Sequence, residues 1–178
     1  MAYQVNNKIN SSKTKTMVLI SVLVSQAIVL SYFERFIPLN LLINIPGMKL
    51  GLANIVTLVS LYMLNFKQST FIVITRTALT AVLFGSMSAF IYSLSGGILS
   101  LFAMGLVKKV AKDKVSVMGI SIVGAAFHNI GQILVAILVV QNTNLIYYLP
   151  FLMITSIVTG VLVGITSGYL ISYLKIKR

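Results

Sequence analysis

Long runs without a charged residue constrain this chain more than any other feature of its sequence. No residue between Thr77 and Val107 is charged, over 31 positions, and none between Met118 and Val140 is charged. About 20 apolar residues cross the hydrocarbon core of a bilayer as a helix. The second run therefore fits one transmembrane helix, while the first is too long for one. The chain is predicted to be an integral membrane protein.

Composition and charge support this class. Of the 178 residues, 58% are apolar and 9% are charged, and the mean hydropathy is +1.00. Soluble domains carry about a quarter charged residues. A net charge of +12 is also compatible with nucleic-acid binding, but the basic residues lie at the ends of apolar runs, where they act as topology signals. Nucleic acid is therefore rejected as a partner, and a multi-pass protein of the cell membrane is expected.

The alternation of apolar runs and basic residues predicts an all-helical bundle of six transmembrane helices. Eleven of the 14 Lys and Arg residues then fall on one side, two fall on the other, and Arg76 lies within the membrane. Because basic loops stay in the cytoplasm, both termini are predicted to be cytoplasmic. We expect a polar tail over residues 1–16 and one membrane domain over 17–178, with spans at about 17–33, 50–66, 69–84, 87–107, 118–140 and 150–173.

The only histidine lies in the middle of the fifth predicted span. On a helix, Ser121, Gly124, His128 and Gln132 share one stripe, and Asn129 lies about a quarter turn away. Polar side chains at this depth are costly in lipid, so the stripe is expected to face other helices or a cavity. Two interpretations remain open. The stripe either binds a ligand or makes interhelical hydrogen bonds that hold the bundle together.

Arg76 lies within a predicted span, where a buried arginine costs at least about 2.5 kcal/mol. Its guanidinium is expected to extend to the cytoplasmic face, to bind an anion, or to be satisfied by backbone carbonyls and water. Neither Glu34 nor Asp113 is expected at its depth. The intramembrane polar residues together predict a cavity for a carboxylate, phosphate or carbonyl-rich ligand. These candidate ligand-binding residues are Asn54, Arg76, Thr80, Tyr92, His128, Asn129 and Gln132.

Residues 36–49 are too apolar for an ordinary solvated loop, and two prolines and a glycine prevent a long helix there. We predict a lid between the first two spans that closes the cavity from the outer side. Its gating residues would be Glu34, Pro46, Gly47 and Lys49. The alternative is an interfacial anchor without a gating role.

Small residues recur every four positions in two predicted spans, a spacing that lets helices approach closely. The sixth span carries Gly160, Gly164 and Gly168, which are expected to pack within the chain, with a partner interface as the alternative. The first span carries two further pairs, which are Ser21 with Ser25 and Ala27 with Ser31.

Several chemistries are excluded by what the sequence lacks. There is no cysteine, so disulfides and thiol chemistry are absent, and one histidine with two distant acids makes a metal site or another cofactor unexpected. No Walker A motif is present for ATP hydrolysis. Two separated acids cannot supply the clustered aspartates of a magnesium-dependent prenyl transferase. The chain is therefore expected not to be an enzyme.

Four sequence blocks resemble one known family. The block IPGMKLGLANIVTL at residues 45–58 resembles the most recognisable motif of the Gx transporter family, which is also labelled heptaprenyl diphosphate synthase component I. The further blocks follow in the same order, and the resemblance covers nearly the whole chain after residue 17. They are FGS at 84–86 with SGG at 95–97, AFHNIGQ at 126–132, and YYLP at 147–150.

This resemblance implies a fold similar to the six-helix substrate-binding (S) components of energy-coupling factor transporters. Such components bind a vitamin-like ligand from outside under a lid, while a transmembrane coupling protein and two ATPases drive its release. The small-residue pairs of the first span resemble the alanine-rich docking motif of these components, although serines replace some alanines. The expected function is thus binding of a small anionic or isoprenoid-related ligand without ATP hydrolysis.

Two other functions remain open. One is a non-catalytic membrane subunit that anchors or feeds a polyprenyl diphosphate synthase in menaquinone synthesis. The other is an assembly or redox-associated membrane partner that binds no free ligand. The bilayer is a partner in all three cases.

Overall fold

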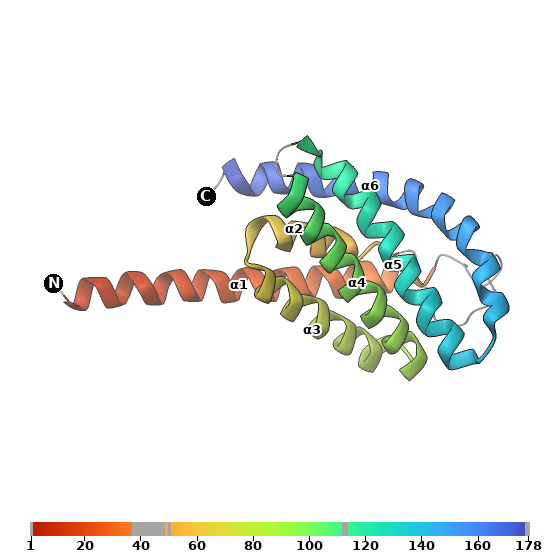
Figure 1. Ribbon diagram of the computed structural model, residues 1–178. Coiled ribbons are helices and arrows are strands. Elements are labelled where there is room, and N and C mark those ends of the chain that lie inside the picture. The colour runs from red at the N-terminus through yellow and green to blue at the C-terminus, as the bar shows by residue number, and fades with distance from the viewer. Residues whose placement is uncertain (1, 37–48, 50, 112–113, 177–178) are drawn as a thin grey trace.

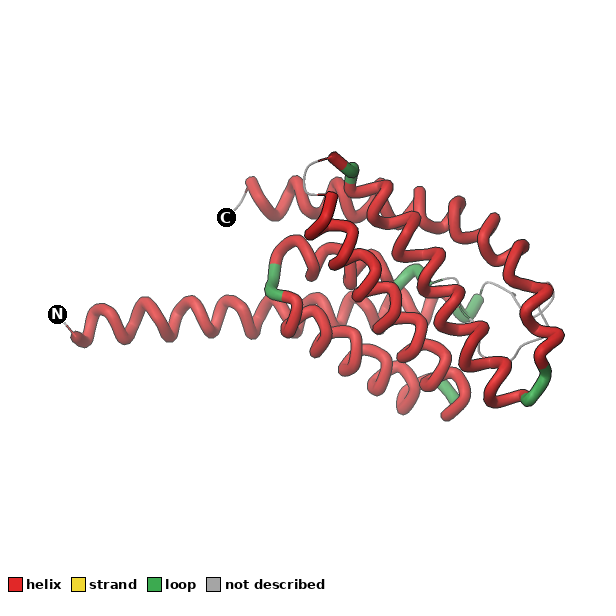
Figure 2. The backbone as a smooth tube through the Cα atoms, viewed as in Figure 1, coloured by secondary structure: helices red, strands yellow, loops and turns green. Residues whose placement is uncertain are grey.

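The computed structural model describes residues 2–36, 49, 51–111 and 114–176 (Figure 1). All regular secondary structure within these residues is helical (Figure 2), which confirms the all-helical prediction. The elements in chain order are α1 (Ala2–Glu34), α2 (Asn54–Met63), α3 (Phe66–Phe84), α4 (Met87–Ala111), α5 (Val117–Val140), the 3-10 helix η3 (Thr143–Tyr148) and α6 (Leu149–Ile176).

The described residues form six α-helices, and four segments of this part of the chain are long and apolar enough to cross a membrane: Lys13–Glu34, Met87–Ala111, Val117–Val140 and Thr143–Leu174. The second predicted span, 50–66, differs most from its prediction, because α2 has ten residues and a length of about 15 Å, half the hydrocarbon core. Helix α3 has 19 residues and is less apolar, since it contains Lys67, Arg76 and four threonines.

The helix α1 also differs from its prediction, because it begins at Ala2 and includes most of the expected polar tail. No proline or glycine occurs before Pro38. Extending an existing helix adds one hydrogen bond per ordered residue, so nothing in the sequence stops the first span from continuing toward the N-terminus. This part of α1 projects beyond the bundle in Figure 1.

The short helix α2 lies at the centre of the bundle. It contacts α1, α3, α4, α5 and α6, and nine of its ten residues are buried. It ends where Leu64 turns to an extended conformation, and α3 begins after Asn65, whose backbone N–H donates to Gln68 Oε1 at 3.1 Å. A helix that is enclosed by protein on all sides can carry polar residues that a lipid-facing helix cannot.

Glycines set the closest helix crossings. A Cβ at Gly131 of α5 would lie 2.9 Å from Gly96 Cα of α4, and a Cβ at Gly160 of α6 would lie 2.6 Å from Ile122 Cα of α5. Gly164 packs on Met118 in the same way, at 2.7 Å. These backbones approach because no side chain separates them.

The remaining predicted packing residues divide into contacting and exposed positions. Gly168 has no atom within 4 Å of the Cβ position that a side chain would occupy. On α1, Ala27 and Ser31 are buried. Ser21 and Ser25 are exposed, and their hydroxyls donate to the carbonyls of Met17 and Ser21 in the same helix.

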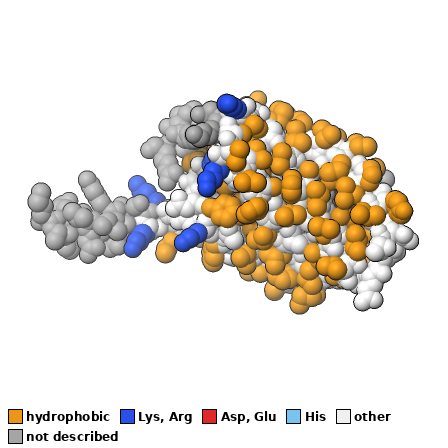
Figure 3. Space-filling model, in the orientation of Figure 1, with side chains coloured by type: hydrophobic (Ala, Val, Ile, Leu, Met, Phe, Trp, Pro, Cys, Tyr) orange, Lys and Arg blue, Asp and Glu red, His pale blue; other side chains and the backbone are white. Residues whose placement is uncertain are grey.

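Exposed apolar side chains cover the visible face of the bundle, and Lys and Arg side chains gather at one end (Figure 3). Examples of these exposed side chains are Val82, Phe102, Leu138 and Ile154. Together with the apolar helices, this belt is that of a multi-pass membrane protein.

Candidate functional site

The candidate site forms at the N-terminus of α2. A Cβ at Gly51 would lie 3.0 Å from His128 Cδ2, and His128 is the twelfth of the 24 residues of α5. The N-terminus of α2 is therefore about halfway along α5. Gly51 has a φ of +88°, which a residue with a side chain rarely adopts, so glycine serves both the turn and the close approach here.

Glu34, the last residue of α1, precedes the predicted lid and hydrogen-bonds to residues that follow it. Its buried carboxylate accepts hydrogen bonds from the backbone N–H groups of Gly51 and Leu52. Both groups precede the first turn of α2, where the helix dipole favours negative charge. Glu34 was expected at the outer interface, and instead it lies within the site.

Arg76 reaches the same place from the middle of α3. Its Nη2 donates to Asn54 Oδ1 at 3.3 Å and to Thr57 Oγ1 at 3.4 Å, and both acceptors belong to the first turn of α2. The residue is 4% exposed. The guanidinium therefore faces the interior of the bundle and does not extend to its surface.

Glu34 and Arg76 line one cavity together with Lys49. The expectation that no carboxylate shares the depth of Arg76 is therefore wrong, because the end of α1 and the middle of α3 line the same cavity. Formally, the three side chains carry two positive charges and one negative charge. Burial lowers the pKa of Lys49, and the attraction of Glu34 opposes this shift.

The α5 side of the site is a chain of amide and imidazole groups. Gln132 Nε2 lies 2.9 Å from His128 Nε2, and Gln132 Oε1 accepts from the Lys49 backbone N–H at 3.4 Å. With its oxygen used by Lys49, the Gln132 amide donates to His128 Nε2, which places the imidazole proton on Nδ1. The segment that precedes α2 is thus held by Glu34 on one side and by Gln132 on the other.

The cavity enclosed by these groups has a volume of about 10 Å³, the space of a single water molecule. Five buried polar atoms at the site have no hydrogen-bond partner among the described residues, and each such atom costs about 1–3 kcal/mol. They are Asn54 Nδ2, Arg76 Nε, Thr80 Oγ1, Ser93 Oγ and His128 Nδ1. The lining residues are Ser31, Glu34, Lys49, Gly51, Ala53, Arg76, Thr77, Thr80, Ser93 and His128.

The structure places the sequence-predicted ligand-binding residues in three groups. Arg76, Thr80 and His128 line the cavity. Asn54 and Gln132 each hydrogen-bond to a lining residue.

The other two predicted ligand-binding residues lie away from the cavity. The Nδ2 of Asn129 donates to the Leu152 carbonyl of α6 at 2.9 Å, and Tyr92 is buried in an apolar cluster with Ile133 and Leu145. Of the predicted gating residues, Glu34 and Lys49 line the cavity, while Pro46 and Gly47 fall outside the described residues.

Sequence reasoning missed Ser93 and Thr77 as lining residues and assigned Ser31 to helix packing alone. The sequence did contain a sign that α4 lines the cavity. Gly96 and Gly97 follow Ser93 by one helical turn, and paired glycines indicate that other groups approach the helix closely there. A Cβ at Gly96 would lie 2.9 Å from His128 Nδ1, and one at Gly97 would lie 3.3 Å from Arg76 Nη2. The paired glycines make room for the side chains of His128 and Arg76.

Among the described residues, no group of three or more His, Cys, Asp or Glu side chains lies close enough together to hold a metal ion. The site presents hydrogen-bond donors, hydroxyls and four ionisable side chains, which are those of Glu34, Lys49, Arg76 and His128.

Comparison with known proteins relates the chain to one family. No curated protein and no solved structure matches it. The family model described as heptaprenyl diphosphate synthase component I matches residues 23–170, in agreement with the resemblance of the sequence blocks. Because this match covers most of the 178 residues, the protein belongs to the heptaprenyl diphosphate synthase component I family.

Proposed function

We propose that this protein is the substrate-binding membrane component of an uptake system and binds one small anionic ligand in the cavity at the start of α2. The observation that carries the proposal is the group of five buried polar atoms without partners. Buried polar groups in proteins are almost always hydrogen-bonded. A cluster of exceptions on several helices that meet at one cavity is best explained by a ligand that supplies the missing partners.

The chemistry of the site favours a ligand rich in hydrogen-bond acceptors. Arg76 Nε and Asn54 Nδ2 are donors, and the hydroxyls of Thr80 and Ser93 can donate as well. The formal charges of Lys49, Arg76 and Glu34 sum to +1. A ligand with one carboxylate or one singly charged phosphate group would neutralise the site, and the guanidinium would bind that group through charge-assisted hydrogen bonds.

Ligand entry requires the segment before α2 to move, because about 10 Å³ holds no more than a water molecule. The backbone N–H groups of Lys49, Gly51 and Leu52 donate to the side chains of Gln132 and Glu34, and these are the bonds that such a movement would break. An incoming anion can take over the N–H groups at the start of α2 and release the Glu34 carboxylate. Binding and opening of the predicted lid would then be one exchange reaction, with no ATP hydrolysed by this chain.

A second candidate function is a non-catalytic membrane subunit associated with a polyprenyl diphosphate synthase. The family description, which names a component of such a synthase, favours it. In that case the polar cluster would stabilise the bundle, and the surface outside the membrane would bind the catalytic partner.

Native mass spectrometry of the full-length protein, purified in detergent, tests the proposal. We expect a co-purified small molecule of defined mass on the wild type, lost from Arg76→Gln and retained by Thr77→Val, whose hydroxyl bonds only to carbonyls of its own helix. If both variants fold and carry the same adducts as the wild type, the cavity does not bind the ligand. A co-purified synthase with no small molecule would favour the second function.

A further inference from the structure

The position of one proton in the cavity depends on a residue outside α5. His128, the only histidine in the chain, is followed one turn later by Gln132, and the two side chains are 3% and 0% exposed. Residues four apart on a helix are neighbours, and Gln132 Nε2 lies 2.9 Å from His128 Nε2. A neutral imidazole has one N–H donor and one acceptor nitrogen, so its proton can sit on either nitrogen. The groups around the ring decide which tautomer forms.

The backbone N–H of Lys49 sets the orientation of the Gln132 carboxamide. This N–H can only donate, and it donates to Gln132 Oε1 at 3.4 Å. The amide nitrogen of Gln132 then faces His128 Nε2, and it can only donate as well. A proton on His128 Nε2 would bring two donors together, and rotation of the carboxamide would only move this conflict to Lys49. While Lys49 is in place, the proton therefore belongs on Nδ1.

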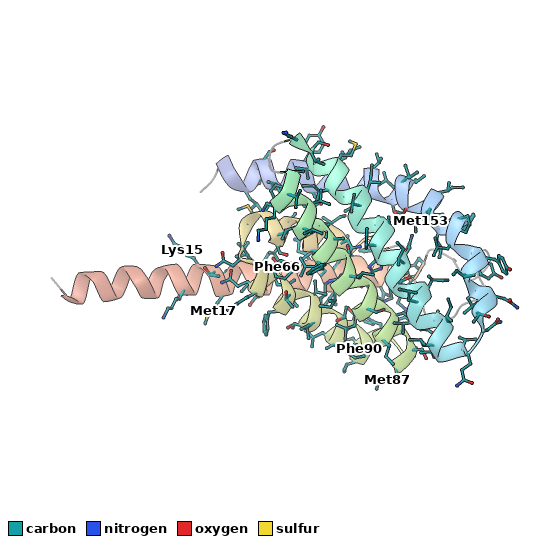
Figure 4. All side chains as sticks on the ribbon, viewed as in Figure 1. Lys15, Met17, Phe66, Met87, Phe90 and Met153 are labelled. Atoms are coloured by element: carbon teal, nitrogen blue, oxygen red, sulfur yellow. The ribbon has the colours of Figure 1, made fainter. Side chains whose placement is uncertain are left out.

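The two edges of the imidazole ring face different parts of the bundle. On one side, a Cβ at Gly51 would lie 3.0 Å from His128 Cδ2 and 3.2 Å from Nε2. On the other side, a Cβ at Gly96 of α4 would lie 2.9 Å from Nδ1. Helix α4, which begins at Met87 (labelled in Figure 4), packs along α5. The ring thus connects the residues before α2 with α4.

His128 Nδ1 has no hydrogen-bond partner among the described residues. Ser93 of α4 lines the same cavity, and its hydroxyl has no partner there either. A buried hydrogen-bonding group without a partner is costly, so a ligand that supplies the partner is favoured. The proton decides which ligand group fits: an acceptor oxygen suits Nδ1–H, whereas an amine or another donor suits Nδ1 without its proton.

We propose that Gln132 is a positioning residue that makes ligand selection at His128 depend on Lys49. While the Lys49 N–H binds Gln132, His128 is held as the Nδ1–H tautomer and selects a carboxylate, phosphate or carbonyl oxygen. When Lys49 moves away, the carboxamide is free to rotate and both tautomers become available. This role rests on the proposed function, but the tautomer itself can be measured without any ligand.

Nitrogen NMR of the full-length protein, labelled with ¹⁵N-histidine and purified in detergent without a histidine tag, tests this inference. The single histidine gives one pair of ring signals, and the chemical shift distinguishes a protonated from an unprotonated nitrogen. We expect the Nδ1–H form of the wild type in about tenfold excess or more, because the other form leaves a buried donor without an acceptor. A ligand oxygen at Nδ1 would favour the same form.

Two substitutions at position 49 separate the backbone N–H from the side chain. Lys49→Pro removes the N–H and should lower the excess of the Nδ1–H form about tenfold, whereas Lys49→Met removes only the ammonium group and should keep the wild-type tautomer. Gln132→Met removes the amide and should also abolish the excess, which tests the inference even where Lys49→Pro does not fold. Asn129→Leu removes a buried hydrogen bond on the other face of α5 and should leave the tautomer unchanged.

Several results would overturn the inference. These are a predominant Nε2–H form in the wild type, an unchanged Nδ1–H excess in folded Gln132→Met, and equal effects of Lys49→Pro and Lys49→Met. The proposed function fails separately. A wild-type protein without co-purified ligand that shows the Nδ1–H form contradicts the ligand binding and supports the positioning by Gln132, whereas a ligand-bearing protein with mixed tautomers contradicts the positioning alone.

Discussion

The two faces of α5 each bury a polar residue, but only one of these residues, His128, has a buried side-chain atom without a hydrogen-bond partner among the described residues. Asn129 faces α6 and donates to the Leu152 carbonyl, in a region where Gly160 and Gly164 bring the two helix backbones together. His128 faces α2 and α4, keeps one nitrogen without a partner and lines a cavity. The comparison teaches that depth in the membrane does not identify a binding residue. Two neighbouring residues at the same depth differ in whether their hydrogen-bonding groups have partners.

The largest expected effect is on the α6 face. Gly160→Val places methyl groups against the backbone of α5, where a Cβ alone would be 2.6 Å from Ile122 Cα. Overpacking of this kind should lower the free energy of unfolding by about 3 kcal/mol, measured by thermal denaturation in detergent. Gly168→Ala is the matched control. It has no neighbour within 4 Å, and it should leave stability unchanged or raise it slightly. Equal effects would show that α6 does not pack as described.

A substitution on the cavity face should change the free energy of unfolding in the opposite direction. Thr80→Val removes a buried hydroxyl that has no partner, so the free energy of unfolding should rise by about 1 kcal/mol while the co-purified ligand is lost. Thr77→Val, one turn earlier and also at the cavity, removes a hydroxyl bonded to Val73 O at 2.8 Å and should retain the ligand. A destabilised Thr80→Val protein that keeps its ligand would contradict the assignment of a binding role to this face.

Asn129 should contribute to stability alone. Asn129→Leu removes the hydrogen bond to the Leu152 carbonyl, and polar contacts between membrane helices contribute about 0.6 kcal/mol on average. The carbonyl keeps a second donor in the Thr155 hydroxyl, which limits the loss. Thermal denaturation should show this small decrease with ligand binding unchanged. Loss of the ligand from a folded Asn129→Leu protein would extend the binding face to α6.

A further expected effect is a pH dependence carried by the cavity face. Burial lowers the pKa of Lys49, so between that lowered value and 10.5 the unfolded chain holds more protons than the folded one. Stability should therefore rise with pH across this window, by at most about 1.4 kcal/mol per pH unit. Thermal denaturation of Lys49→Met should show a shallower rise, because Glu34, Arg35 and Arg76 remain but the titrating amine is gone. Identical slopes would mean that Lys49 is solvated.

Much of the fold was predictable because local patterns carry it. Uncharged runs indicated the helices that the structure has as α4 and α5. The small-residue spacing of the sixth span predicted packing within the chain, and in the structure Gly160 and Gly164 lie against α5 while Gly168 has no close neighbour. The stripe that contains His128 correctly indicated a buried polar face. By contrast, the length of α2 was not predictable. The apolar residues before Asn54 are compatible both with the start of a transmembrane helix and with a re-entrant segment.

By itself, the sequence determined a helical membrane protein with polar residues at mid-depth, since the length of an apolar run and the positions of its charges are properties of short segments. Tertiary structure alone decided which polar residues meet. Glu34 and Arg76 belong to different helices, and they line one cavity because the end of α1 packs beside α3. Whether a buried side chain is satisfied, as Asn129 is, or left without a partner, as Thr80 is, depends on atoms that distant segments bring to it.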